Sequence, residues 1–174
     1  MDTSSQEEFN RFVAEMGGDS QDTLLRPALE TNFKNILTSL DNNDINICLG
    51  SFTDDITLVV DTKSPGGICK GKEELISHFQ DDHAIFPEIT TIPIAIIVDR
   101  GRITCYAEKY FIYEDESGLM RTTLIICDLD DSHLIQRMEF RKVKEDLEFG
   151  ESEGDDMQQK SRGMATKMAI QYGM

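Results

Sequence analysis

Residues 90–143 read TTIPIAIIVDRGRITCYAEKYFIYEDESGLMRTTLIICDLDDSHLIQRMEFRKV, and this stretch decides the fold class. β-branched and aromatic residues gather in four runs, which we predict to be strands at Thr90–Val98, Arg102–Tyr113, Leu119–Leu129 and His133–Val143. Only short polar segments separate these runs, and short connections favour antiparallel hairpins over crossovers. The stretch therefore predicts an antiparallel meander.

Helical periodicity precedes this meander. An apolar stripe predicts a long helix that has Pro27 in its first turn, the stripe being formed by Leu25, Leu29, Phe33, Ile36 and Leu40. A short helix is expected over 44–52, a first strand from Ile56, and another helix over 72–80 that ends before His83. Helices followed by a run of strands indicate the α+β class, with helices packed on one face of a curved sheet.

The two ends of the chain differ from this middle part. Ser5 and Glu8 form a capping-box pattern, which predicts a short helix over 9–16 inside an N-terminal extension, residues 1–22. Residues 144–174 are polar, acidic and glycine-containing, and we expect them to be a mobile tail. The last stretch, MATKMAIQYGM, is also consistent with a weak helix that uses Met164, Met168 and Tyr172. The folded domain is therefore predicted to be 23–143.

Composition restricts the class of partner. A chain of 174 residues with 39% hydrophobic content suits one globular domain. A net charge of −16 argues against nucleic acid and anionic membranes as partners. The four cysteines lack a C-x-x-C pair, and the N-terminus lacks an apolar secretory segment. We expect free thiols and a cytoplasmic location.

Three blocks carry a resemblance to a known family. They are NDINICLGSFTDDITLVV at 43–60, GKEELISHF at 71–79 after a glycine loop, and DLDDSHLIQRMEFRKV at 128–143. In order and spacing they resemble the SnoaL-like branch of the nuclear transport factor 2-like superfamily, which includes ketosteroid isomerases and polyketide cyclases. The resemblance implies a cone-shaped, curved antiparallel sheet with helices packed on its concave face around an apolar pocket.

The resemblance also implies a catalytic carboxylate. In ketosteroid isomerases the general base is an aspartate at the end of the first strand, and Asp61 falls near that place. Thr57 and Val59 share the face of Asp61 along this strand and are expected to line the cavity with it. Asp61 is also consistent with an ordinary strand-terminating residue that faces water.

The remaining catalytic groups of the isomerases are not matched. Their oxyanion hole needs a tyrosine and a protonated aspartate, but Ile36 and Ile125 occupy the corresponding places, and neither can donate a hydrogen bond. Tyr106 or Tyr110 replaces these donors if the register is shifted by one residue. His78 is a further pocket candidate if its helix face turns inward. The predicted catalytic set is therefore Asp61, His78 and Tyr106.

No metal or cofactor site is predicted. His78 and His83 flank two aspartates, but a spacing of five splays two side chains on a helix, and solvated polar residues at a helix end are the simpler interpretation. His133 is expected in an exposed hairpin turn. A glycine-rich phosphate loop and a nucleophile elbow are both missing from the sequence.

Two functions follow from the sequence. The first is an isomerase, cyclase or hydratase that acts on a small apolar molecule with Asp61 as base. The alternative is a non-catalytic binding or scaffold domain whose cavity is filled by its own side chains. The resemblance implies a homodimer in either case. Arg137, Glu139 and Arg141 are expected on the outer face of the last strand, either at that contact or in ion pairs with Glu108, with Met138 and Phe140 in the core.

Overall fold

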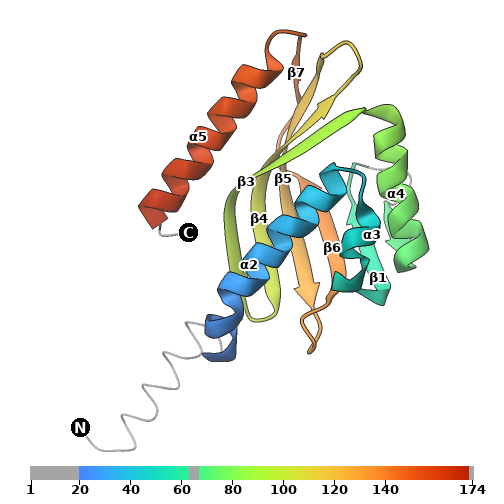
Figure 1. The fold of residues 1–174 in the computed structure, drawn as a ribbon, viewed down its shortest axis with the longest axis vertical. Helices are drawn as coiled ribbons and strands as arrows, with labels where there is room; N and C mark the ends of the chain where they lie inside the picture. The colour runs from blue at the N-terminus through green and yellow to red at the C-terminus, as the bar shows by residue number, and fades with distance from the viewer. Residues whose placement is uncertain (1–19, 63–66, 173–174) are drawn as a thin grey trace, which may run out of the picture.

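The computed structural model describes residues 20–62 and 67–172. Figure 1 shows a curved sheet with helices α2, α3 and α4 on one side and the C-terminal helix, α5, on the other. The helix predicted over 9–16 lies outside the described residues. Among the described residues, no helix combines the length and the apolar character that crossing a membrane requires.

The helices on the concave side are α2 (Ser20–Asp41), α3 (Ile45–Cys48) and α4 (Gly71–Ile85), and a 3-10 turn, η1 (Leu49–Ser51), follows α3. The apolar stripe of α2 is confirmed, because Phe33, Ile36 and Leu40 are buried. The placement of Pro27 was wrong: α2 begins at Ser20, so Pro27 lies in the helix interior and removes one main-chain donor there. The end of α4 was also wrong, because the helix continues through His83.

In the part of the chain that the structure describes, seven strands form one sheet. They are β1 (Phe52–Val60), β2 (Ile68–Lys70), β3 (Glu88–Asp99), β4 (Arg102–Ile112), β5 (Gly118–Leu129), β6 (Ile135–Lys142) and β7 (Leu147–Phe149). Their order is β2-β1-β6-β5-β4-β3, with β7 paired to β5. The predicted hairpins are confirmed, and β1 against β6 is the parallel pair. The class is α+β with a curved, unclosed sheet, as predicted.

A bulge in β3 switches the face on which its apolar residues lie. Ile92 pairs with Glu108 and Ile96 pairs with Cys105, and the register shifts between Pro93 and Ala95. Ile92 and Ile94 therefore pack on one side of the sheet, and Ile96 packs in the main core on the other side. Proline lacks the N–H that a regular ladder needs, so a bulge is a favourable place for it.

The main core lies between the concave side of the sheet and helices α2, α3 and α4. Met138 and Phe140 belong to it, as predicted. The four cysteines are buried free thiols. This core fills most of the interior but leaves a cavity beside α4, described below.

The chain after residue 143 departs from the expected tail. β7 pairs with β5, and α5 (Gly154–Tyr172) lies along β3 on the side of the sheet opposite α2 (Figure 1). A second apolar cluster is buried beneath α5, formed by Ile92, Ile94, Tyr110, Ile112, Met120 and Phe149. The ring of Phe149 approaches so closely that a Cβ on Gly118 would lie 2.8 Å from it. Because β7 is a strand of the sheet and α5 covers an apolar cluster on one face of it, both elements are part of the fold.

Candidate functional site

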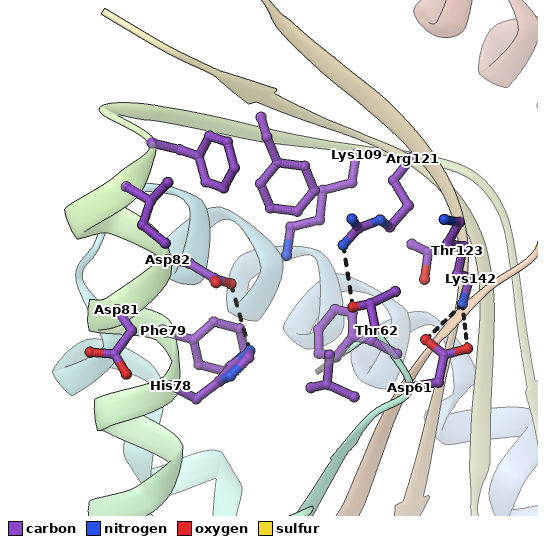
Figure 2. A pocket seen from close by; sticks show the side chains of 15 residues that line it. Asp61, Thr62, His78, Phe79, Asp81, Asp82, Lys109, Arg121, Thr123 and Lys142 are labelled. Carbon is purple, nitrogen blue, oxygen red and sulfur yellow. Dashed lines mark hydrogen bonds and ion pairs between the residues drawn. The ribbon is translucent and has the colours of Figure 1, made fainter. Parts of the chain in front are cut away.

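A cavity of about 330 Å³ opens between α4 and the concave face of β4, β5 and β6. Figure 2 shows Lys109 and Arg121 near each other, with His78, Asp81 and Asp82 on one side of them and Asp61, Thr62, Thr123 and Lys142 on the other. The lining residues are Val60, Asp61, Thr62, His78, Phe79, Asp81, Asp82, Ile85, Phe86, Lys109, Phe111, Arg121, Thr123, Phe140 and Lys142. This volume lies within the range of small-molecule sites.

Lys109 projects from β4 into this cavity and is enclosed by aromatic rings. Its Nζ lies 4.8 Å from the ring centroid of Phe140, 5.1 Å from that of Phe111 and 5.9 Å from that of Phe79. The three rings come from β6, β4 and α4, so the tertiary fold assembles this surround. Ring faces attract cations, typically by about 0.5–2 kcal/mol each. The rings hold the amine in place and provide the apolar walls of the cavity.

The electrostatic setting of Lys109 is unusual. Its side chain is buried, and no carboxylate of the described residues forms an ion pair with it. Burial lowers the pKa of Lys109, Asp41 and Asp82 act in the opposite direction at longer range, and Arg121 lowers the pKa further. A perturbed titratable group in a cleft marks a candidate functional site.

Arg121 is a second cation in the lining of the cavity, directly opposite Lys109 on the neighbouring strand β5. Its guanidinium stacks on Phe111 at 5.1 Å from the ring centroid. Nε and one Nη donate to the two carboxylate oxygens of Asp146 at 3.0 and 2.9 Å. These hydrogen bonds hold the pKa of the Asp146 carboxyl below its usual range. Arg121 is thus fixed in place from outside the cavity while one face of its guanidinium remains against the aromatic wall.

His78 lines the opposite wall of the cavity on α4 and is buried, which confirms that its helix face turns inward. Its Nε2 lies 3.6 Å from a carboxylate oxygen of Asp82, one helical turn further on. His83 turns away, and its Nε2 lies 2.7 Å from the carbonyl oxygen of Leu40. The described residues contain no cluster of three or more side chains able to hold a metal ion.

Asp61 stands at the mouth of the cavity and is exposed, so its expected burial is wrong. Its carboxylate accepts a hydrogen bond from the main-chain N–H of Lys142, with both oxygens within 3.2 Å of that nitrogen. The face assignment along β1 was reversed too: Val60 lines the cavity, whereas Thr57 and Val59 pair with Arg137 and Glu139 on the outer face.

Tyr106 is not brought to the cavity. It packs with the cluster beneath α5, on the opposite side of the sheet. Tyr110 lies on that side as well, and its hydroxyl donates to the carbonyl oxygen of Met157 at 2.9 Å. Glu108 accepts a hydrogen bond from Ser161 Oγ at 2.8 Å beneath the same helix, so the predicted ion pairs with Glu108 do not form. Glu139 pairs instead with Arg137 and Arg141.

Ile36 and Ile125 are buried in the main core. The two residues that the resemblance aligned with the hydrogen-bond donors of ketosteroid isomerases are therefore apolar core residues. The polar groups of the cavity come instead from the end of β1, from α4 and from strands β4, β5 and β6.

Sequence reasoning missed Lys109 and Arg121. One pattern could have identified Lys109: Glu108 and Lys109 interrupt a long apolar strand, ITCYAEKYFIY, so one of the two must face each buried side. Arg121 carried no comparable pattern, because its role depends on a ring from the neighbouring strand.

Comparison with known proteins places this geometry in a fold class. No protein-family model matches the sequence, and no curated protein matches it significantly. Solved structures do match. A putative scytalone dehydratase from Novosphingobium aromaticivorans superposes with a TM-score of 0.61 at 14% identity, over 75% of this chain and 91% of that one.

Two further structures agree. A nuclear transport factor 2-like protein from Anabaena variabilis gives a TM-score of 0.61 at 14% identity, covering 72% of this chain and 93% of that one. SalBIII, an epoxide hydrolase/cyclase-like enzyme in pyran ring formation in the polyether salinomycin, gives 0.58 at 10% identity, covering 68% and 92%. The chain therefore has the nuclear transport factor 2-like fold, as the sequence predicted. At these identities the likeness establishes the fold alone.

Proposed function

We propose that the protein binds a small molecule that has an apolar body and one carboxylate or carbonyl group. The observation that carries this proposal is a cavity of about 330 Å³ with Lys109 at its inner wall and no carboxylate of the described residues paired to it. The rings of Phe79, Phe111 and Phe140 suit an apolar body. An amine donates hydrogen bonds in both protonation states, so a ligand oxygen would satisfy it.

The physical argument concerns the positive charge on this wall. Ligand oxygens accept hydrogen bonds from lysine and arginine side chains, and a hydrogen bond to a charged group typically contributes roughly 1.5–3 kcal/mol. Lys109 and Arg121 lie directly opposite each other on the neighbouring strands β4 and β5, and Arg121 lowers the pKa of Lys109. A ligand oxygen that contacts both side chains reduces this repulsion, so the binding free energy favours an electron-rich group beside them.

The fluorescent anion 8-anilinonaphthalene-1-sulfonate tests the proposal, because it combines an apolar body with one anionic group. We expect saturable binding to the full chain, weakened about tenfold in Lys109→Met, since a lost charged hydrogen bond costs roughly 1.5–3 kcal/mol. Lys160→Met is the matched control, because Lys160 is exposed on α5. Equal binding by both variants, or no binding to the wild type, would overturn the proposal.

Catalysis on the bound molecule is the next step of the proposal. Asp61 lines the mouth of the same cavity, where a carboxylate can take a proton from a ligand C–H as an isomerase, cyclase or hydratase requires. His78 lines the same cavity from α4, on the side away from Asp61. Two of the similar structures are described as a cyclase-like enzyme and a putative dehydratase. If Asp61 is the base, Asp61→Asn should abolish turnover of a carbonyl or enone substrate and leave the fold intact. An unaltered rate would favour the alternative, a non-catalytic binding domain.

A homodimer through the outer face of the sheet is proposed for either case. Glu139 fixes Arg137 at 3.2 Å and Arg141 at 3.1 Å in an ordered charged row, with half-buried Val59 beside it. Light scattering should give a dimer, and Glu139→Lys should dissociate it, while Glu151→Lys on an exposed turn should have no effect. A wild-type monomer at micromolar concentration contradicts the dimer, and a dimer unaffected by Glu139→Lys moves the contact elsewhere.

A further inference from the structure

We propose that Lys109 is a nucleophilic amine that forms an imine with the carbonyl carbon of an aldehyde or ketone bound in the cavity. The inference rests on the proposed binding function and narrows its ligand to a carbonyl compound. It assigns Lys109 a catalytic role that neither the sequence analysis nor the likeness in fold provides.

The first support is geometric. Nζ of Lys109 points into the cavity and is surrounded by Phe79, Phe111 and Phe140, whose ring centroids lie within 5.9 Å of it (Figure 2). Among the described residues, no carboxylate forms an ion pair with Lys109, so the amine stays directed into the cavity. A carbonyl compound that fills the apolar part of the cavity therefore brings its carbon next to this nitrogen.

The second support is the protonation state that the surroundings favour. Only the neutral amine is a nucleophile, and a lysine is activated by desolvation or by a neighbouring cation. Both conditions hold here, because burial lowers the pKa of Lys109 and Arg121 lowers it further. Asp41 and Asp82 oppose the shift, and the three rings also favour the ammonium.

The reaction balances with groups that line the cavity. The nitrogen lone pair attacks the carbonyl carbon, a C–N bond forms, and the C=O π electrons move to oxygen, which gains a proton as nitrogen loses one. The resulting carbinolamine then loses its hydroxyl group as water when that oxygen is protonated and nitrogen gives up its second proton. The His78–Asp82 pair, with 3.6 Å between nitrogen and oxygen, lies on the facing wall and can relay these protons.

An imine would also stabilise the negative charge that develops when a C–H next to the carbonyl carbon loses its proton. The places of the oxyanion donors are filled by Ile36 and Ile125, so hydrogen bonds from there cannot stabilise an enolate. A protonated imine withdraws electrons from the adjacent carbon and makes its C–H acidic without such donors. Asp61, at the mouth of the same cavity, is then a base for that proton.

The test uses the full chain and 2-naphthaldehyde with cyanoborohydride at pH 7, which reduces an imine to a stable secondary amine. Peptide mass spectrometry then gives the labelled fraction at each lysine. We expect Lys109 to be labelled several-fold faster than exposed Lys160, because a lowered pKa raises the fraction of neutral amine at pH 7. Unfolding in urea should abolish the preference, and 8-anilinonaphthalene-1-sulfonate should compete with the label.

Two variants separate the outcomes. Lys109→Arg keeps the positive charge and should lose the fast labelling, and Lys109→Met does the same if the larger arginine disturbs the cavity. Labelling of Lys109 that is no faster than that of Lys160 would overturn the imine proposal. If the sulfonate still binds in that case, the proposed binding function stands; if it does not bind, both proposals fail.

Discussion

Glu108 and Lys109 are neighbours in the chain and are buried to nearly the same extent, 9% and 7% exposed, yet they lie in opposite regions of the molecule. Glu108 faces α5 and accepts a hydrogen bond from Ser161, which also lies against the Tyr110 hydroxyl. Lys109 faces the cavity, and among the described residues it meets rings and no paired carboxylate.

The difference separates a structural role from a functional one. A buried charge whose hydrogen bonds are all made inside the protein anchors one element to another, as Glu108 anchors α5 to the sheet. A buried amine left open toward a cavity lowers stability and persists where a ligand or a reaction uses it. Three perturbations test whether the two regions really differ in this way.

Removing α5 should have the largest effect. Truncation after Gly150 exposes Tyr110, Met120 and Phe149, and burial of each such side chain contributes roughly 1.5–3 kcal/mol. We therefore expect the free energy of unfolding to fall by about 5 kcal/mol, or the protein to become insoluble, in urea denaturation. An unchanged unfolding curve would mean that residues 151–174 are a dispensable tail after all.

Single substitutions on the two sides of the sheet should change the free energy of unfolding differently: a loss beneath α5, and little change or a gain in the cavity. Ser161→Ala leaves Glu108 without its hydrogen-bond partner and removes one of the two partners of the Tyr110 hydroxyl, which keeps the carbonyl oxygen of Met157; it should cost about 1–3 kcal/mol of stability. Lys109→Met replaces a buried amine with an apolar side chain of similar length and should change stability by less than about 1 kcal/mol, or increase it. Chemical denaturation of both variants checks this, and a larger loss for Lys109→Met would contradict the functional role.

The smallest effect is a pH dependence that belongs to Lys109. Its pKa in the folded protein lies below the unfolded value, so the cost of burying the ammonium is complete below the folded pKa and disappears as the pH rises toward about 10.4. Wild-type stability should therefore rise relative to Lys109→Met as the pH increases through that window. Denaturation curves of the two proteins at matched pH values measure the difference, and parallel profiles would show that the pKa of Lys109 is not lowered.

Much of the fold was predictable because its periodicities are local. The β-rich runs and their short connections gave the hairpins, and the alternation in β6 placed Met138 and Phe140 in the core. The docking of α5 was not predictable, because the apolar face that it covers depends on the bulge near Pro93, which turns Ile92 and Ile94 to that side. A polar composition cannot reveal a helix whose few apolar contacts are all tertiary.

The candidate site was predictable only in part. The place of His78 on the inner face of α4 followed from its spacing to Leu75. Asp61 was correctly placed at the end of its strand. The face of β1 that points inward was not predicted correctly, because Val60 lies on it and Thr57 and Val59 do not. Lys109 acquires its character from three rings on three different elements, and no local pattern encodes such an assembly.

A crystal structure of the protein with 8-anilinonaphthalene-1-sulfonate would test the central claim most directly. The account predicts the aromatic body of the probe among Phe79, Phe111 and Phe140, with the sulfonate beside Lys109. A cavity closed by its own side chains, with the probe absent or bound only on the outer face of the sheet, would contradict it.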